Sequence, residues 1–216
     1  TYLTKISLKL HLPVEGLIKS TIFNQFSGGG TREDCMKVIE KMYTKKVHRI
    51  LDYSVEGKVE EAEFDAAMKK KISIIEFASE KKELPYAVFK PTGVGRFEIW
   101  EKVSSKEALS TEEEEEWARV KNRVDLICGA AYKNDISVLA DGEESWMQDA
   151  ADNLMEEMME KYNQEKAIVL NTLQCYRWDR GNYLQALHSK AKAAGYKVGA
   201  KIVRGAYMEI ENQRAN

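Results

Sequence analysis

The sequence predicts an α/β protein built as part of a (β/α)8 barrel. Short apolar runs alternate with amphipathic helical patterns, which is typical of parallel strands joined by helical crossovers. A polar residue ends or follows each of the five runs, namely Asp52, Lys90, Asp141, Gln174 and Arg204. Polar residues at the carboxyl end of every strand favour a barrel rim. A doubly wound sheet, which concentrates functional residues at one switch point, stays the alternative.

The chain is expected to contain an N-terminal helical segment, residues 1–45, followed by the barrel domain, residues 46–216. The glycines at 28–30 interrupt an apolar stretch and could cradle a phosphate. They lack the lysine of a P-loop and the spacing of a dinucleotide fingerprint, so an ordinary turn is the competing interpretation. Thr31 and the acidic residue Asp34 then predict the start of a helix that ends near residue 44.

The first two strand–helix units follow. Residues 47–53 are predicted to form a strand and residues 60–81 a helix, whose apolar residues recur at helical spacing. Residues 86–89 form the second predicted strand, which a Lys-Pro-Thr-Gly stop ends sharply. Lys90 stands where a catalytic barrel lysine would stand, although a surface lysine at a turn has the same pattern.

Residues 97–112 are interpreted as an excursion from the barrel, and the helix that follows continues to about residue 131. Its acidic run, residues 112–116, is expected to be a solvated helix face. The third strand, residues 136–140, ends at Asp141 and leads into a helix that extends to Tyr162. Asp141 could face a catalytic site or could cap that helix.

The last two predicted strands are residues 167–176 and residues 198–203, with a helix at 182–194 between them that Gly195 caps. A complete barrel of this type needs about 250 residues. The sequence is therefore expected to hold about five of eight strand–helix units, with the C-terminal units absent.

Composition excludes several classes of protein. A net charge of −2 does not favour a nucleic-acid binder, and no apolar run reaches the length of a transmembrane helix. Cys35, Cys128 and Cys175 are widely spaced and have no clustered histidines, so neither a metal site nor a disulfide framework is expected. Three prolines leave no evident flexible linker.

Several motifs, in chain order, resemble those of the proline dehydrogenase family, in particular its monofunctional form that also occurs in mitochondria. They are residues 26–29 (FSGG), 51–57 (LDYSVEG), 90–93 (KPTG), 141–148 (DGEESWMQ), 171–176 (NTLQCY) and 201–209 (KIVRGAYME). Each motif is weak alone, but together they cover most of residues 22–216 and coincide with the predicted strand ends.

The resemblance implies a distorted (β/α)8 barrel that binds FAD at its C-terminal face, which agrees with the lack of a GxGxxG fingerprint. It implies oxidation of L-proline to Δ1-pyrroline-5-carboxylate by hydride transfer to flavin N5, with the electrons passed to a membrane quinone. A hydroxyproline dehydrogenase of the same family is the alternative. It further implies peripheral contact with a membrane, either from the bacterial cytoplasm or on the matrix side in mitochondria.

Carried over position by position, the resemblance implies catalytic roles for Lys90 and Asp141, as a charge pair that positions the substrate. The implied cofactor-binding residues are Gln174, Lys201, Arg204, Gly205, Ala206 and Tyr207. Lys201 or Arg204 can pair with a phosphate or stabilise a reduced flavin, and Gln174 offers both a donor and an acceptor. Gly205 would let the backbone approach the cofactor closely.

The family binds the proline carboxylate through paired arginines on its last helix, which would lie beyond Asn216. Two other classes of function remain open on the residues alone. A flavin-free barrel enzyme could use Lys90 as a Schiff base. A non-catalytic barrel fragment could serve as a partner-binding module.

Overall fold

The computed structural model describes residue 29, residues 32–52 and residues 60–215, in two compact units, Thr1–Arg49 and Ile50–Asn216. Most of the expected N-terminal segment and its glycines 28 and 30 lie outside the described residues, as do 53–57 of the LDYSVEG motif. In the first unit, helix α4 (Arg32–Tyr43) carries Glu33 and Asp34 in its first turn. This confirms the predicted helix with an acidic first turn.

The second unit contains a parallel sheet whose strands lie in the order in which they occur in the chain. Its strands are β1 (Ile50–Leu51), β2 (Tyr86–Phe89), β3 (Ser137–Ala140), β4 (Val169–Gln174) and β5 (Ala200–Val203). Its helices are α5 (Glu61–Ser79), α6 (Phe97–Ser105), α7 (Thr111–Lys133), α8 (Gln148–Tyr162), α9 (Arg180–Ala194) and α10 (Met208–Ala215).

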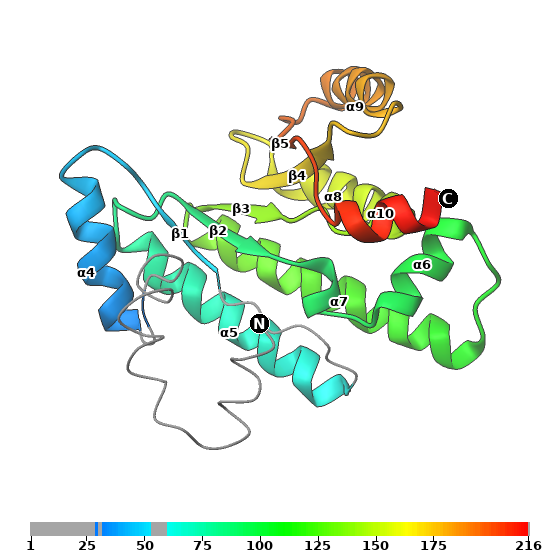
Figure 1. The fold of residues 1–216 in the computed structure, drawn as a ribbon, viewed down its shortest axis with the longest axis horizontal. Helices are drawn as coiled ribbons and strands as arrows, with labels where there is room; N and C mark the ends of the chain where they lie inside the picture. Colours follow the sequence, from blue (N-terminus) through cyan, green and yellow to red (C-terminus); the bar gives the residue numbers. More distant parts are fainter. Residues whose placement is uncertain (1–28, 30–31, 53–59, 216) are drawn as a thin grey trace. The chain divides into compact units, whose positions relative to one another are not determined.

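Helices α5 and α7 run along one face of the sheet, and α8 continues that layer beneath β4 (Figure 1). A doubly wound sheet reverses its strand order and carries helices on both faces. Consecutive strand order with the crossover helices on one side is instead the arrangement in an arc of a (β/α) barrel. The predicted fold class is confirmed for the described part of the chain.

The core lies between the sheet and these helices. Val88 and Phe89 are both buried, and so are Leu139 and Ala140. Because successive strand residues point to opposite faces, the sheet is covered on both sides near the carboxyl ends of β2 and β3. This explains why these strands read as continuous apolar runs in the sequence.

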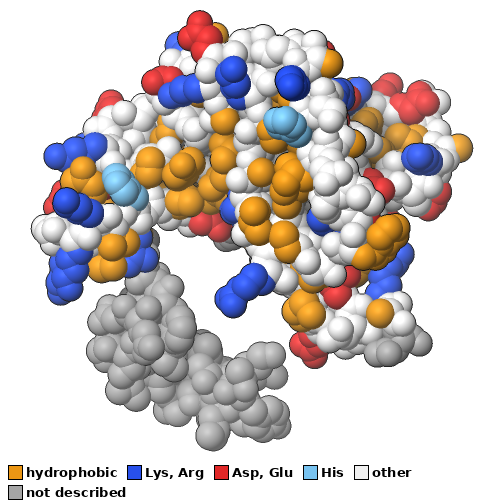
Figure 2. Space-filling model, turned by 90° about the horizontal axis from the view of Figure 1, so that it is seen from above, with side chains coloured by type: hydrophobic (Ala, Val, Ile, Leu, Met, Phe, Trp, Pro, Cys, Tyr) orange, Lys and Arg blue, Asp and Glu red, His pale blue; other side chains and the backbone are white. Residues whose placement is uncertain are grey.

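The face of the sheet turned away from α5 and α7 is apolar but partly open, as the view from above shows (Figure 2). Ile50 and Tyr86 are partners in register and are 43% and 39% exposed. In a barrel this face is directed towards the interior.

The pairing register places the polar strand ends at one level. Phe89 lies beside Ala140, and Thr172 lies beside Lys201. Continuing these registers by one residue sets Lys90 level with Asp141. Residues at one level on parallel strands project to the same side of a sheet, which prepares a shared site.

Two details of the sequence prediction were wrong. The first strand spans only Ile50–Leu51 in place of residues 47–53. The acidic run 112–116 is not a wholly solvated face, because Glu116 is buried and its carboxylate binds the guanidinium of Arg96. Five consecutive helical residues cover more than one turn, so at least one of them must face the neighbouring structure.

Candidate active site

The carboxyl ends of β2 to β5 bring together several of the residues predicted from the sequence. The Lys201 ammonium, from β5, donates to the Asp141 carboxylate directly after β3. The two side chains are 31% and 24% exposed, so the ion pair is partly open to solvent. This pair can present both charges to a bound ligand from fixed positions.

Glu143 lies two residues beyond Asp141 and is 3% exposed. Its Oε2 accepts the backbone N–H of Thr92 at 2.9 Å, and its Oε1 accepts the Thr92 hydroxyl at 2.8 Å. The Tyr207 hydroxyl lies 3.4 Å from Oε1. One carboxylate therefore connects the segments that follow β2, β3 and β5.

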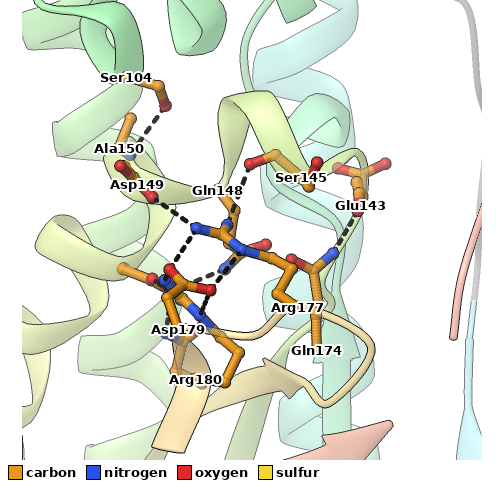
Figure 3. A network of polar contacts seen from close by, with 12 residues as sticks. Ser104, Glu143, Ser145, Gln148, Asp149, Ala150, Gln174, Arg177, Asp179 and Arg180 are labelled. Carbon is orange, nitrogen blue, oxygen red and sulfur yellow. Dashed lines mark hydrogen bonds and ion pairs between the residues drawn. The ribbon is translucent and has the colours of Figure 1, made fainter. Parts of the chain in front are cut away.

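Gln174, at the end of β4, is fully buried. Its Nε2 donates to the backbone carbonyl of Glu143, a contact drawn in Figure 3. Its Oε1 is buried and finds no hydrogen-bond partner among the described residues. A buried amide oxygen without a donor is costly in a folded protein, which makes it a candidate acceptor for a ligand N–H.

Lys90 lies close enough to Glu143 and Tyr207 to act on both pKa values. Burial raises the pKa of the Glu143 carboxyl, against the opposing effects of the Thr92 hydrogen bonds and the Lys90 charge. Burial and the nearby Glu143 raise the pKa of the Tyr207 hydroxyl. The recorded ion pair of Asp141 is with Lys201, and the expected pairing of Lys90 with Asp141 stays a prediction.

A second polar network supports the loops after β3 and β4 (Figure 3). Arg177 donates to the Ser145 carbonyl at 3.1 Å and forms ion pairs with Asp149 at 3.3 Å and Asp179 at 2.7 Å. It thereby ties the turn after β4 to the turn that begins α8. These contacts hold the strand ends in place.

Helix α10, which the sequence reasoning did not predict, closes over the same loops. The Glu211 carboxylate accepts the backbone N–H of Ser145 at 2.7 Å and its hydroxyl at 2.8 Å. The Tyr176 hydroxyl lies 3.2 Å from the same carboxylate. Burial and Glu211 raise the pKa of Tyr176.

The remaining predicted residues lie just after β5. Arg204 and Gly205 are exposed, and Ala206 is half-buried. A Cβ added at Gly205 would lie 3.0 Å from the Met208 sulfur, so the glycine relieves a close approach within the chain itself. The structure brings Lys90, Gln174 and Tyr207 together around Glu143, and leaves Arg204 at the surface.

Glu143, Thr92 and Glu211 were missed by the sequence reasoning. Glu143 carried no distinctive signal, since acidic residues are common just before a helix. Glu211 carried none. Among the described residues, no group of histidine, cysteine, aspartate and glutamate side chains could hold a metal ion.

Comparison with known proteins identifies the family to which this site belongs. The family model described as proline dehydrogenase matches residues 35–216. This range includes the strand-end cluster, which consists of Lys90, Thr92, Asp141, Glu143, Gln174, Lys201 and Tyr207. The chain belongs to the proline dehydrogenase family.

Three named relatives illustrate the similarity. The carbapenem antibiotics biosynthesis protein CarD of Pectobacterium carotovorum subsp. carotovorum is 30% identical over 202 residues, 94% of this chain and 54% of its own length. The mitochondrial proline dehydrogenase 1 of Dictyostelium discoideum is 27% identical over 247 residues, 96% of this chain and 43% of its own length. The human mitochondrial proline dehydrogenase 1 is 37% identical over 106 residues, 49% of this chain and 18% of its own length.

Solved structures share the fold. Proline utilization A from Bdellovibrio bacteriovorus, inactivated by N-propargylglycine, matches with a TM-score of 0.77 and 17% identity, covering 93% of this chain and 22% of that one. The protein from Corynebacterium freiburgense matches with a TM-score of 0.67 and 17% identity, covering 94% of this chain and 20% of that one. The chain thus spans about half or less of the length of the relatives it matches.

The residues present fit a flavin. The unpartnered Oε1 of Gln174 can accept the N–H that the isoalloxazine edge offers, while Nε2 remains engaged with the Glu143 carbonyl. Lys201 supplies a cation at the same strand ends, and Arg204, directly after β5, supplies an exposed one. Both suit an anionic cofactor.

Replacing Gly142 with alanine is expected to disturb this site. A Cβ there would lie 3.0 Å from the Thr172 methyl and 3.1 Å from Cγ of Gln174. Crowding of this kind costs roughly 1–3 kcal/mol, and displacement of Gln174 would weaken flavin retention. Chemical denaturation and flavin content measure the two effects. Gly93→Ala is the matched control, because nothing lies within 4 Å of its added Cβ. Equal behaviour of both variants would contradict the prediction.

Proposed function

We propose that the protein oxidises L-proline to Δ1-pyrroline-5-carboxylate with bound FAD. The observation that carries the proposal is the family match over residues 35–216, within which the charged and buried polar residues converge at the carboxyl ends of β2 to β5. This end of the sheet is where barrel enzymes place their chemistry. One support rests on sequence similarity and the other on the arrangement of the strand ends.

The reaction removes a hydride from a ring carbon of proline and a proton from the ring nitrogen, leaving a carbon–nitrogen double bond. FAD supplies the hydride acceptor. The protein contributes orientation and electrostatics. Asp141, fixed by Lys201, presents a carboxylate that can hold the substrate amine, and Lys90 adds a cation nearby that can position an anionic group.

The cofactor would be held by residues from β4 and β5. The Gln174 amide oxygen could accept a hydrogen bond from the flavin, and Lys201 or Arg204 could pair with a phosphate or with negative charge on the reduced ring. The Gly205–Ala206–Tyr207 stretch offers backbone close to the same strand ends, with small residues at its first two positions.

A membrane quinone is the proposed electron acceptor, reached by peripheral association with a membrane. Several relatives are named as mitochondrial proline dehydrogenases, which places this chemistry in mitochondria in those organisms. Within the described ranges, no helix is long and apolar enough to cross a membrane. We propose the bacterial cytoplasm beside the inner membrane, or the matrix side in a eukaryote, as the location.

A biosynthetic use of the same oxidation is the second candidate. It is favoured by the relative named for carbapenem antibiotic biosynthesis, which is 30% identical over 94% of this chain. Both candidates share the same chemistry at the same site, and they differ in the pathway that consumes the product.

The purified protein tests the proposal through its cofactor and its substrate. Mass spectrometry of the released chromophore should identify FAD. Turnover with a soluble quinone analogue should be faster with L-proline than with trans-4-hydroxy-L-proline. The reverse preference would assign the protein to hydroxyproline oxidation, and absence of flavin together with no turnover of either amino acid would refute the proposal.

A further inference from the structure

Glu143 occupies a central place among the strand ends, and it lies within the DGEESWMQ motif, which does not by itself indicate its role. We infer that Glu143 is a positioning residue that holds the segments carrying Lys90, Gln174 and Tyr207 in one arrangement. The inference deepens the proposed function and rests on it for its catalytic consequence. The structural part of the inference stands on the contacts of Glu143 alone.

The contacts of Glu143 link the end of β3, where it lies, to three other strand ends. Its side chain binds Thr92 through both the backbone N–H and the hydroxyl, which fixes the short 3-10 turn Pro91–Gly93 directly after Lys90. Its backbone carbonyl accepts Nε2 of Gln174 at the end of β4. Its Oε1 lies 3.4 Å from the Tyr207 hydroxyl, after β5. Glu143 itself follows β3.

Burial makes these contacts obligatory. A carboxylate that is 3% exposed is costly unless donors or a cation compensate for the lost water. Here Thr92 provides two donors, and the charge of Lys90 lies near enough to stabilise the anion. Because both carboxylate oxygens are already engaged by protein donors, a positioning role fits Glu143 better than proton transfer to a substrate.

The backbone of Tyr207 supports the same interpretation. Tyr207 has a φ of 54°, in the left-handed region that residues other than glycine rarely adopt. Such a conformation persists when surrounding contacts over-determine it. The approach of its hydroxyl to Glu143 and its interaction with Lys90 are contacts of that kind. Loss of the carboxylate would therefore free both the turn after β2 and the segment after β5.

Hydrogen exchange tests the structural part without requiring activity. In Glu143→Ala, the backbone amide of Thr92 loses its acceptor, so peptides that cover residues 90–96 should exchange faster. Peptides that cover residues 203–209 should also exchange faster, because Tyr207 loses a contact. Glu143→Gln retains the side-chain volume and one acceptor oxygen, and it should show a smaller change at both places. Glu156→Gln is the control, a half-buried glutamate that binds Lys190 in α9 and lies outside both peptides.

Turnover and the flavin spectrum test the catalytic part. Misplacement of catalytic groups by about 1 Å costs on the order of 100-fold in rate. We expect kcat with L-proline to fall about that much in Glu143→Ala, and about 10-fold in Glu143→Gln, which retains the shape of the side chain. The visible flavin spectrum should shift in both variants. Glu156→Gln should change neither kcat nor the spectrum, whatever it does to thermal stability.

The outcomes separate this inference from the proposed function. Unchanged exchange in residues 90–96 and 203–209 of Glu143→Ala would overturn the positioning role, and so would unchanged kcat in an active protein. A wild-type protein that does not oxidise proline would refute the proposed function. The exchange measurement would still decide whether Glu143 holds the strand ends.

Discussion

Replacing Asp141 with asparagine is expected to lower kcat/KM for L-proline about 100-fold or more, with little change in folding. The Asp141 carboxylate holds the Lys201 ammonium across the carboxyl ends of β3 and β5. Asparagine has the same shape but no charge, so Lys201 loses its partner and the site loses the anion that faces a substrate amine. Steady-state kinetics with L-proline measure the effect.

Asp125→Asn is the matched control for this prediction. Asp125 also pairs with a lysine, Lys161 at 2.7 Å, but the pair joins α7 to α8 and lies outside the strand-end cluster. For the double variant Asp141→Asn with Lys201→Met, we compare losses of transition-state free energy obtained from kcat/KM. The loss in the double variant should be no larger than the sum of the losses in the two single variants, because residues in one ion pair act together. If Asp141→Asn behaved like Asp125→Asn, the assignment of Asp141 to the site would be wrong.

Arg180→Met is expected to lower the free energy of unfolding by about 3–5 kcal/mol, the largest effect on stability anticipated for this chain. Arg180 and Asp152 form an ion pair whose side chains are 7% and 4% exposed. The substitution leaves the Asp152 carboxylate buried, and among the described residues its remaining donors are the amides of Gln148 and Asn171, at 2.8 Å and 2.7 Å. Urea denaturation of both proteins gives the difference.

Lys166→Met is the comparison for this second prediction. Lys166 pairs with Asp135 at the surface, where the side chains are 48% and 82% exposed. Exposed ion pairs contribute little to stability, so the variant should unfold nearly as the wild type does. If Arg180→Met lowered the free energy of unfolding no more than Lys166→Met did, the buried pair would not support the N-terminal part of α8 against β4 and α9.

Strands β2 and β3 could be predicted because each is a largely buried apolar run that ends at a polar residue. Leu139, Ala140 and Asp141 illustrate this. A strand that is buried on both faces contains apolar residues, and polar residues occur again where the strand ends and solvent can reach the chain. Similar reasoning located the helices, whose apolar spacing is set by their period. The expected strand at 47–53 was too long, because β1 at the edge pairs only at Ile50 and Leu51.

The contacts within the site could not be predicted to the same extent. Pairing of Lys201 with Asp141 depends on the register between three strands, which no local pattern encodes. The role of Glu143 depends on Thr92, 51 positions earlier, and on Gln174, 31 positions later. Glu116 was misjudged for the same reason, since its acidic neighbours suggest a solvated face and only the position of Arg96 shows otherwise. Position along the chain indicates which residues lie at the rim, whereas tertiary structure decides their partners.

The most direct test of the account is the anaerobic absorbance spectrum of the purified protein before and after addition of L-proline. We predict flavin bands that bleach when L-proline is added and that return when a quinone analogue is supplied. This outcome would establish the cofactor, the substrate and the class of acceptor in one experiment. A flavin spectrum that L-proline leaves unchanged, or a protein that holds no flavin, would contradict the account.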